Sequence, residues 1–250
     1  DQRDLHLSIR RQRQMCIRDR HYFEKGVAIP NINLVNSCFG KESKTDGESE
    51  EGNYIFQQAH LLSIPVRSNT KPYFLVTCPL IISETAERLG FFEAANSNVI
   101  EALQKFAADF DKLNSKAAYT NIYEPDTCLE EEDIVIDSKL SINLEPDHIK
   151  NMFGNGGDFV VIRDELFSTI TDNMHLPVIA RNRLDNGISK ALWYEQLVPR
   201  ESRYLSLVLI PEPDTYKDLF LKGMLSKRIQ IGANATVGYG QCLFSNPFNS

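Results

Sequence analysis

The sequence predicts an α+β fold, and three observations support this. Short apolar runs rich in β-branched and aromatic residues predict strands, among them 54–57, 60–66 and 72–82. An amphipathic stretch over 98–113 has apolar residues three and four positions apart, as in a helix packed on a core. The order of strands and helices mixes hairpins with crossovers. It therefore predicts a split βαβ, ferredoxin-like core with inserted helices.

Composition excludes several classes of protein. The chain has 250 residues, of which 42% are apolar and 24% are charged, so it is neither disordered nor collagen-like. No run approaches the roughly 18 apolar residues of a membrane-spanning helix, and no signal-peptide pattern is present. We therefore expect a cytoplasmic protein without a membrane partner. Five widely spaced cysteines without a CxxC pair predict neither a disulfide framework nor a zinc site.

The first twenty residues differ from the rest. Residues 10–20 read RRQRQMCIRDR and resemble the conceptual translation of a sequencing adapter, and residues 3–6 resemble its primer. The alternative is a natural arginine-rich arm that binds nucleic acid. We expect residues 1–20 to derive from an adapter and not to belong to the fold. Residues 21–250 are expected to form a single domain whose first strand region is missing. Without residues 1–20, 21 basic and 31 acidic residues remain, a net charge of −10.

The N-terminal half of this domain contains a loop and a helical insert. Residues 41–53 are acidic and punctuated by glycine, which is typical of a loop. After the strands, Ser83 can cap a short helix that ends at Gly90. Residues 118–133 look like a loop and complete a helical insert over 83–133. The apolar stripe of the helix over 98–113 consists of Val99, Leu103, Phe106 and Phe110.

Two strands and two helices follow. Alternating apolar residues predict a half-buried strand over 139–144, and Glu145-Pro146 opens a helix through Met152. A buried strand is expected over 158–162 and a helix over 163–171.

The C-terminal third is predicted to contain two hairpins. Residues 176–184 and 189–197 flank Asp185-Asn186-Gly187, a strong signal for a tight turn. A strand over 204–210 and a helix over 213–225 come next. The last pair of strands covers 228–231 and 241–244.

The first hairpin carries a candidate nucleic-acid-binding pattern. Arg181, Arg183 and Lys190 lie on its arms, with Trp193 and Tyr194 close behind. Basic side chains follow a nucleic-acid backbone, and aromatic rings stack on bases. The alternative is a surface hairpin anchored to the core by its tryptophan. Glu195, beside them, suits a general base, a metal ligand or an ion-pair partner.

Other catalytic patterns are weak. The histidines after residue 20 are at none of the spacings typical of metal sites, and no GxSxG motif is present. The glycine-rich segment 229–241, IQIGANATVGYGQ, lacks the spacing of a phosphate-binding P-loop. It suits a glycine-bent hairpin, which could also contact nucleic acid.

Several blocks together resemble one family. Residues 59–68 (AHLLSIPVRS) and 74–79 (FLVTCP) are similar to a signature of the backbone RAMP proteins of type III-B CRISPR Cmr complexes. In the same order, 191–199 (ALWYEQLVP) resembles the family's LWYE block, and 229–241 resembles its closing glycine-rich loop. Cys38-Phe39-Gly40 resembles its LFG motif.

The resemblance implies a fold and a function. The fold would be an RRM-like (ferredoxin-like) RAMP core with a β-hairpin thumb. Such subunits polymerise along a guide crRNA, and their thumbs interrupt the guide–target duplex. A divalent metal, Mg²⁺ by expectation, supports cleavage of the target RNA in antiviral defence. The implied partners are guide crRNA, target RNA, copies of the same chain and other Cmr subunits.

The matching blocks also imply site residues. Glu195 is the candidate catalytic carboxylate, with Tyr194 as its neighbour. The candidate RNA-binding residues are Arg67, Ser68, Arg181, Arg183, Lys190, Gly232, Asn234, Thr236, Gly238 and Tyr239. No metal ligand is assigned. The family's principal aspartate and its Ser/Lys/Gly helix have no counterpart here, and Gln196 and Ala233 depart from the family pattern. Two alternatives stay open, a structural filament subunit that does not cleave RNA and an unrelated α+β enzyme.

Overall fold

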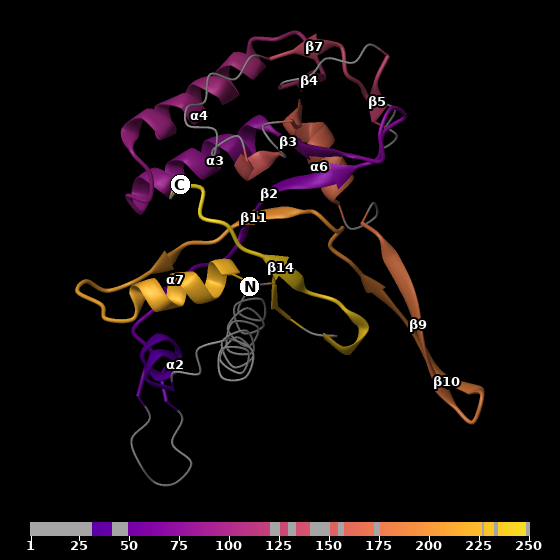
Figure 1. Ribbon diagram of the computed structural model, residues 1–250. Helices are drawn as coiled ribbons and strands as arrows, with labels where there is room; N and C mark the ends of the chain where they lie inside the picture. The colour runs from indigo at the N-terminus through magenta and orange to yellow at the C-terminus, as the bar shows by residue number, and fades with distance from the viewer. Residues whose placement is uncertain are drawn as a thin grey trace, which may run out of the picture. The chain divides into compact units, whose positions relative to one another are not determined.

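The computed structural model describes most of the chain after residue 31 (Figure 1). It describes residues 32–41, 50–120, 126–129, 134–140, 151–154, 158–172, 176–226, 228–232 and 235–248. These residues form two compact units: unit 1 lies within 1–58 and 206–246, and unit 2 within 59–205 and 247–250. No helix in the described ranges is long and apolar enough to cross a membrane. The single domain predicted over 21–250 stays a prediction.

Unit 2 is built on a six-stranded mixed sheet of order β11-β2-β3-β8-β4-β7. Its strands are β2 (His60–Val66), β3 (Phe74–Thr77), β4 (Ala117–Tyr119), β7 (Ser138–Lys139), β8 (Val160–Ile162) and β11 (Arg203–Leu205). β2 runs antiparallel to both β11 and β3, whereas β8 is parallel to β3 and antiparallel to β4. Antiparallel neighbours together with parallel crossovers confirm the predicted α+β class.

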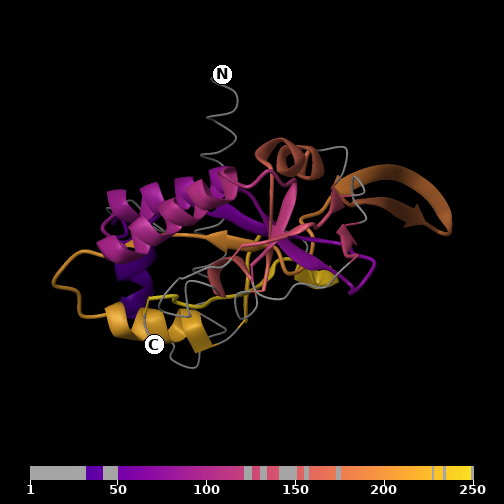
Figure 2. The ribbon, with the colours of Figure 1, turned by 90° about the horizontal axis from the view of Figure 1, so that it is seen from above.

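Three helices belong to the same unit: α3 (Pro79–Phe91), α4 (Ser97–Asp111) and α6 (Asp164–Thr171). Figure 2 shows α3 and α4 side by side. The side chain of Asn96 caps α4 by accepting a hydrogen bond of 3.0 Å from the backbone N–H of Val99. All four residues of the predicted apolar stripe of α4 are buried. The amphipathic pattern therefore identified this helix and its buried face.

Two predictions before α4 are wrong. The strand expected over 72–82 ends at Thr77, and α3 begins at Pro79. Proline suits this first-turn position because the N–H it lacks would have no partner inside the helix. The carboxylate of Asp164 accepts a hydrogen bond of 3.0 Å from the N–H of Leu80 in this turn. Ser83 therefore lies inside α3, and Gly90 does not end it.

The segment after α4 also differs from prediction. The loop expected over 118–133 contains the end of β4 and strand β5 (Cys128–Leu129), which pairs with β6 (Ile134–Val135). Residues 141–150 are not described, so most of the strand over 139–144 and most of the helix over 145–152 lie outside the described residues; Lys139 ends β7. The strand over 158–162 and the helix over 163–171 are confirmed as β8 and α6.

The core of unit 2 lies between sheet and helices. The rings of Phe74 on β3 and Tyr119 on β4, the two strands on either side of β8, are 5.3 Å apart edge to face. Phe106 of α4 packs against Phe159 with ring centres 6.1 Å apart. All four rings are buried. Edge-to-face aromatic pairs add directional attraction to the burial of apolar area, so the Phe106–Phe159 pair helps to orient α4 on the sheet.

Unit 1 combines the start of the described chain with its end. Its elements are α2 (Ile32–Phe39), β1 (Ile55–Phe56), β12 (Val208–Leu209), α7 (Lys217–Ser226), β13 (Arg228–Gln230), the 3-10 helix η2 (Ala235–Val237) and β14 (Gln241–Leu243). β1 pairs with β12 and β13 with β14, both antiparallel. The strand predicted over 204–210 is thus two strands, β11 in unit 2 and β12 in unit 1.

A buried tyrosine joins three segments of unit 1. The Tyr54 hydroxyl donates a hydrogen bond of 2.7 Å to the carboxylate of Asp214, just before α7. Its ring packs edge to face on Phe220 of α7 at 5.0 Å. The neighbouring Cys38 of α2 belongs to the same buried cluster. Burial and the hydrogen bond to Asp214 raise the pKa of Tyr54 above its usual range.

Two glycines close the base of the acidic loop. The N–H of Lys41 donates to the carbonyl of Glu50 at 2.8 Å, and the N–H of Glu50 to the carbonyl of Lys41 at 3.1 Å. Gly40 has φ +82, and a Cβ there would lie 2.4 Å from the Glu50 carbonyl oxygen. A Cβ at Gly52 would lie 2.4 Å from the Cys38 carbonyl oxygen. Only glycine permits this approach of two backbones. Residues 42–49 of the loop lie outside the described residues.

The buried thiols predict how stability depends on alkaline pH. Burial raises the pKa of Cys38 and of Cys78 to about 12. The unfolded chain releases these protons near pH ~8.5. The contribution of the two thiols to the free energy of unfolding is therefore fully present below this pH and is lost as the pH rises toward 12. In urea titrations from pH 8 to 11, we expect the double variant Cys38→Ala/Cys78→Ala to show a shallower alkaline fall, by up to about 1.4 kcal/mol per pH unit for each thiol.

The matched control is Cys242→Ala, which removes a half-buried thiol from β14. Because it removes neither of the two buried thiols, it should change the alkaline slope less than the double variant does. Equal alkaline slopes in the double variant and the unsubstituted chain would contradict the raised pKa values of Cys38 and Cys78.

Candidate nucleic-acid interface

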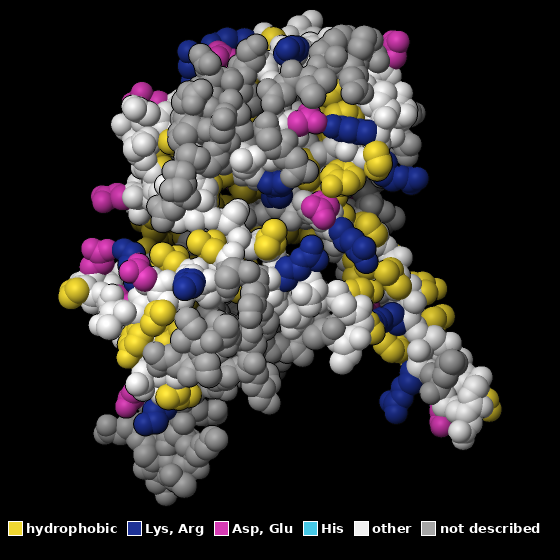
Figure 3. Space-filling model, viewed as in Figure 1, with side chains coloured by type: hydrophobic (Ala, Val, Ile, Leu, Met, Phe, Trp, Pro, Cys, Tyr) yellow, Lys and Arg dark blue, Asp and Glu magenta, His cyan; other side chains and the backbone are white. Residues whose placement is uncertain are grey.

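The predicted hairpin is present and projects from the sheet of unit 2 (Figures 1 and 2). It consists of β9 (Val178–Asp185) and β10 (Ile188–Gln196), which pair antiparallel. Asn186 and Gly187 form the turn with φ +50 and +79, the positive angles that an Asn-Gly turn requires. Every side chain of β10 except that of Glu195 is exposed. Hydrophobic and basic side chains are therefore open to solvent along the hairpin, as Figure 3 shows.

The pairing register sorts the hairpin side chains onto two faces. Arg181 lies opposite Trp193, and Glu195 lies opposite Ile179. Because side chains alternate along a strand, one face, here called the arginine face, carries Ile179, Arg181, Arg183, Ala191, Trp193 and Glu195. The other, here called the apolar face, carries Val178, Ala180, Asn182, Leu192, Tyr194 and Gln196. Lys190 lies where the register shifts between Ser189 and Ala191, and it is exposed.

Glu195 contacts two other predicted residues. Its Oε2 lies 3.3 Å from Nε of Arg181, and its Oε1 accepts a hydrogen bond of 2.9 Å from Nε1 of Trp193. Of the three roles left open for this carboxylate, the structure shows the ion-pair partner. Trp193 is 42% exposed and lies on the hairpin, not in a core. Tyr194 is on the apolar face, so the structure does not bring it together with Glu195 as a catalytic pair.

The described residues contain no cluster of side chains typical of an all-protein metal site. No group of three or more His, Cys, Asp or Glu side chains within the described ranges lies close enough to hold a metal ion. Glu195 is already in contact with a guanidinium. The magnesium ion that the resemblance implies therefore stays a prediction, and we derive no chemical step through it.

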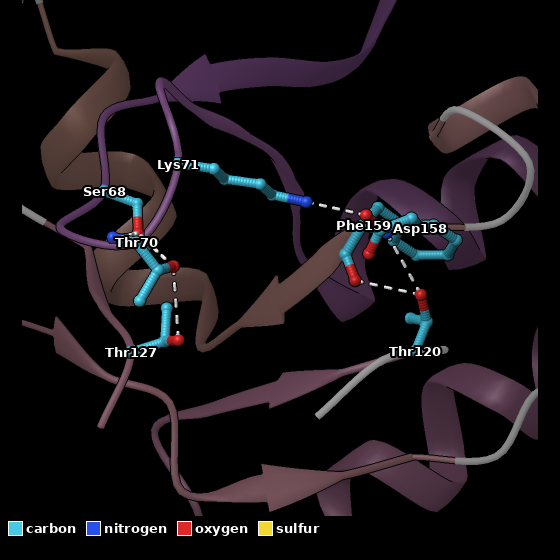
Figure 4. Close-up of polar contacts among 7 residues, drawn as sticks. All are labelled: Ser68, Thr70, Lys71, Thr120, Thr127, Asp158 and Phe159. Carbon is cyan, nitrogen blue, oxygen red and sulfur yellow. Dashed lines mark hydrogen bonds and ion pairs between the residues drawn. The ribbon is translucent and has the colours of Figure 1, made fainter. Parts of the chain in front are cut away.

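Arg67 and Ser68 begin the loop between β2 and β3. Arg67 is exposed, whereas Ser68 is buried. The Ser68 Oγ accepts a hydrogen bond of 3.3 Å from the backbone N–H of Thr70, whose hydroxyl lies 3.3 Å from that of Thr127 (Figure 4). Asn69 reinforces this contact by accepting a hydrogen bond of 2.8 Å from the Cys128 N–H. Ser68 thus shapes the loop that presents Arg67, and the RNA contacts of both stay predictions.

The same loop carries an ion pair that the sequence analysis missed. Nζ of Lys71 lies 2.6 Å from Oδ2 of Asp158 (Figure 4). The same Nζ lies 3.7 Å from the centre of the Phe74 ring. The other oxygen of Asp158 is buried without a hydrogen-bond partner. Next to it, the Thr120 hydroxyl donates to the carbonyl of Phe159 at 2.9 Å. The pair therefore ties the β2–β3 loop to the start of β8.

The glycine-rich segment forms a bent hairpin in unit 1, the structural alternative predicted for it. Its glycines Gly232, Gly238 and Gly240 have φ +85, +81 and +71. The N–H of Ile231 donates to the carbonyl of Gly240 at 2.8 Å, which continues the pairing of β13 with β14. Thr236 and Gly238 are exposed and Tyr239 is half-buried. Asn234 lies outside the described residues, and the RNA contacts of this segment stay predictions.

Fold and hairpin together define an α+β protein with an exposed, basic, aromatic-bearing hairpin. A family model described as the RAMP superfamily matches residues 10–243, so the chain belongs to the RAMP superfamily. The match begins within residues 1–20, which lie outside the described residues. This membership confirms the family resemblance and argues against the unrelated α+β enzyme.

Known relatives agree with this assignment. The chain is 27% identical over 237 residues to the CRISPR system Cmr endoribonuclease Cmr4 of Pyrococcus furiosus, covering 82% of this chain and 72% of that protein. A cryo-EM structure of the type III-B Cmr-beta complex bound to cognate target RNA contains a chain with a TM-score of 0.67 and 18% identity, covering 90% of this chain and 79% of that one. The crystal structure of oligomeric Cmr4 from Pyrococcus furiosus has a TM-score of 0.60 and 22% identity, covering 90% of this chain and 81% of that one. The two structural similarities support the RAMP fold.

Proposed function

We propose that this chain is an RNA-binding backbone subunit of a cytoplasmic type III-B CRISPR complex that acts in antiviral defence. Its partners would be guide crRNA, target RNA, copies of itself and other Cmr subunits. The observation that carries the proposal is the arginine face of the exposed hairpin. The similarity to Cmr4 and to a chain of a target-bound Cmr-beta complex supports the same function.

The hairpin supplies the two interactions that single-stranded RNA needs. Arg181, Arg183 and Lys190 bring positive charge to the hairpin that projects from the sheet, and guanidinium groups form strong hydrogen bonds with phosphate. Trp193 and Tyr194 are 42% and 68% exposed on opposite faces, and bases stack on exposed aromatic rings. The chain as a whole has a formal net charge of −7. RNA binding would therefore depend on this local surface and not on the overall charge.

Removing the two arginines should weaken RNA binding. For Arg181→Ala/Arg183→Ala we expect the Kd for a labelled single-stranded RNA to rise at least about tenfold, since hydrogen bonds to charged groups contribute about 1.5–3 kcal/mol. The slope of log K against log salt should become shallower by about 0.7 for each phosphate that the variant no longer neutralises. Fluorescence anisotropy at several salt concentrations measures both.

Lys105→Ala is the matched control for this pair. It removes one exposed positive charge from α4 of the same unit, away from the hairpin. Its Kd should stay close to that of the unsubstituted chain. No RNA binding by the unsubstituted chain, or equal Kd values for it and the arginine variant, would refute the proposed function.

We further propose that the subunit supports metal-dependent cleavage of target RNA. The test is incubation of the chain with guide RNA and an end-labelled complementary target, in Mg²⁺ or in EDTA. We expect discrete products in Mg²⁺ and none in EDTA, with products restored by excess Mg²⁺. A chain that binds guide and target but yields no product would be the structural filament subunit that does not cleave.

A further inference from the structure

We propose that Glu195 is a positioning residue for RNA binding: its carboxylate holds the Arg181 guanidinium and the Trp193 indole in one arrangement on the arginine face. The proposal rests on the proposed function, because it concerns how the hairpin binds RNA. It gives Glu195 a role that needs neither a metal nor a proton transfer.

The hairpin register creates the arrangement. Arg181 and Trp193 face each other across the two strands, and Glu195 lies two residues along β10 from Trp193 on the same face. Side chains at directly opposed and diagonal positions of an antiparallel pair are within contact distance. Each oxygen of the carboxylate has its own partner, Oε1 the indole N–H at 2.9 Å and Oε2 the guanidinium Nε at 3.3 Å.

Burial strengthens this contact. Arg181 and Glu195 are the two half-buried side chains among the described residues of the hairpin, with side-chain exposures of 19% and 26%. A charge pair that is partly removed from water is screened less than one on an open surface. The contact should therefore persist in solution on a hairpin that is otherwise exposed.

Holding these side chains before RNA arrives favours binding. An arginine side chain loses much rotamer freedom when it is fixed on a ligand. An Arg181 already ordered by Glu195 loses less of that freedom on binding, and Trp193 gains a fixed ring plane on which a base can stack. A carboxylate that only repelled RNA would instead weaken binding by its charge. The two roles thus predict opposite signs for removal of Glu195.

The first measurement follows Trp193, the single tryptophan of the chain. In Glu195→Ala the indole N–H loses its partner, so without RNA the emission maximum should shift and acrylamide quenching should increase. Asp185→Asn removes the same charge from the tip of the same hairpin and should leave the emission unchanged. An unchanged Trp193 signal in Glu195→Ala overturns the proposal whether or not the chain binds RNA.

The second measurement is RNA affinity in EDTA. We expect Glu195→Ala to raise the Kd by about 2- to 10-fold, the range for one side chain that must be ordered on binding. Glu195→Gln keeps one acceptor oxygen and should lose less. Asp185→Asn should bind as tightly as the unsubstituted chain or more tightly. Circular dichroism on each variant checks that the fold is kept.

A double-mutant cycle completes the test. If Glu195 acts through Arg181, the variant Arg181→Ala/Glu195→Ala should lose less affinity than the two single losses combined. Additive losses, or tighter binding by Glu195→Ala, would overturn the positioning role. Unchanged affinity with loss of target cleavage would also overturn it, in favour of a catalytic carboxylate. No RNA binding by the unsubstituted chain, with the Trp193 shift present, would refute the proposed function and leave the side-chain contact standing.

Discussion

Phe110→Ala should lower the free energy of unfolding by about 4 kcal/mol, within the range for truncating a buried phenylalanine. Phe110 is fully buried at the end of α4, and the guanidinium of Arg163 lies 5.0 Å from its ring centre. Removing the ring would leave a cavity between α4 and the start of α6 and take away a cation–π contact. Urea denaturation followed by circular dichroism measures the change.

Phe91→Ala is the matched control in the same pair of helices. Its ring is 81% exposed at the end of α3, with an edge-to-face contact to Phe92 at 4.9 Å. We expect a change below about 1 kcal/mol, because the substitution removes little buried area. Equal destabilisation by the two substitutions would contradict the packing of α4.

The contrast between these two phenylalanines shows when a sequence pattern is enough to predict burial. Phe110 belongs to a stripe with helical spacing, and that local periodicity predicts a buried face. Phe91 follows Gly90, where the sequence indicated a helix end, and no pattern shows whether a ring there is covered. The start of α3 at Pro79 was missed for a related reason. Apolar residues over 79–82 suit a strand as well as a buried helix turn.

The hairpin could be predicted because its turn depends only on residues that are adjacent in the sequence. Asn186-Gly187 tolerates the positive φ angles that reverse the chain, and these angles are present. The contact between Arg181 and Glu195 depends instead on the register of the two arms. A slip of one residue would place the two side chains on opposite faces. The sequence could therefore name both residues as candidates but could not choose among the roles of Glu195.

No pattern in the sequence predicted the contacts between residues far apart along the chain. Lys71 and Asp158 are 87 positions apart in the sequence, and Arg163 donates a hydrogen bond of 2.8 Å to the carbonyl of Ser115, 48 positions away. Neither pair has a spacing that a helix, strand or turn would produce. Such contacts follow from the order of strands in the sheet, which local patterns do not determine.

Gly240→Ala should destabilise unit 1 by about 3 kcal/mol or more, the sum of a strained backbone and an overpacked contact. Gly240 has φ +71, and a Cβ there would lie 1.8 Å from the carbonyl oxygen of Ile231. The N–H of Ile231 is hydrogen-bonded to the carbonyl of Gly240, so the backbone cannot move aside without breaking the pairing of β13 with β14. Urea denaturation and amide hydrogen exchange over 228–243 measure the loss of stability.

Gly238→Ala separates backbone strain from steric clash and also tests the role of this loop. Gly238 has φ +81, but a Cβ there would meet no atom within 4 Å. Only the conformational strain of about 1–2 kcal/mol is expected. Because this variant should stay folded, a rise in its Kd for RNA would indicate contact between the exposed loop and RNA, whereas weaker binding by Gly240→Ala would reflect only the disrupted hairpin. Equal destabilisation by both substitutions would contradict the close approach of Gly240 to Ile231.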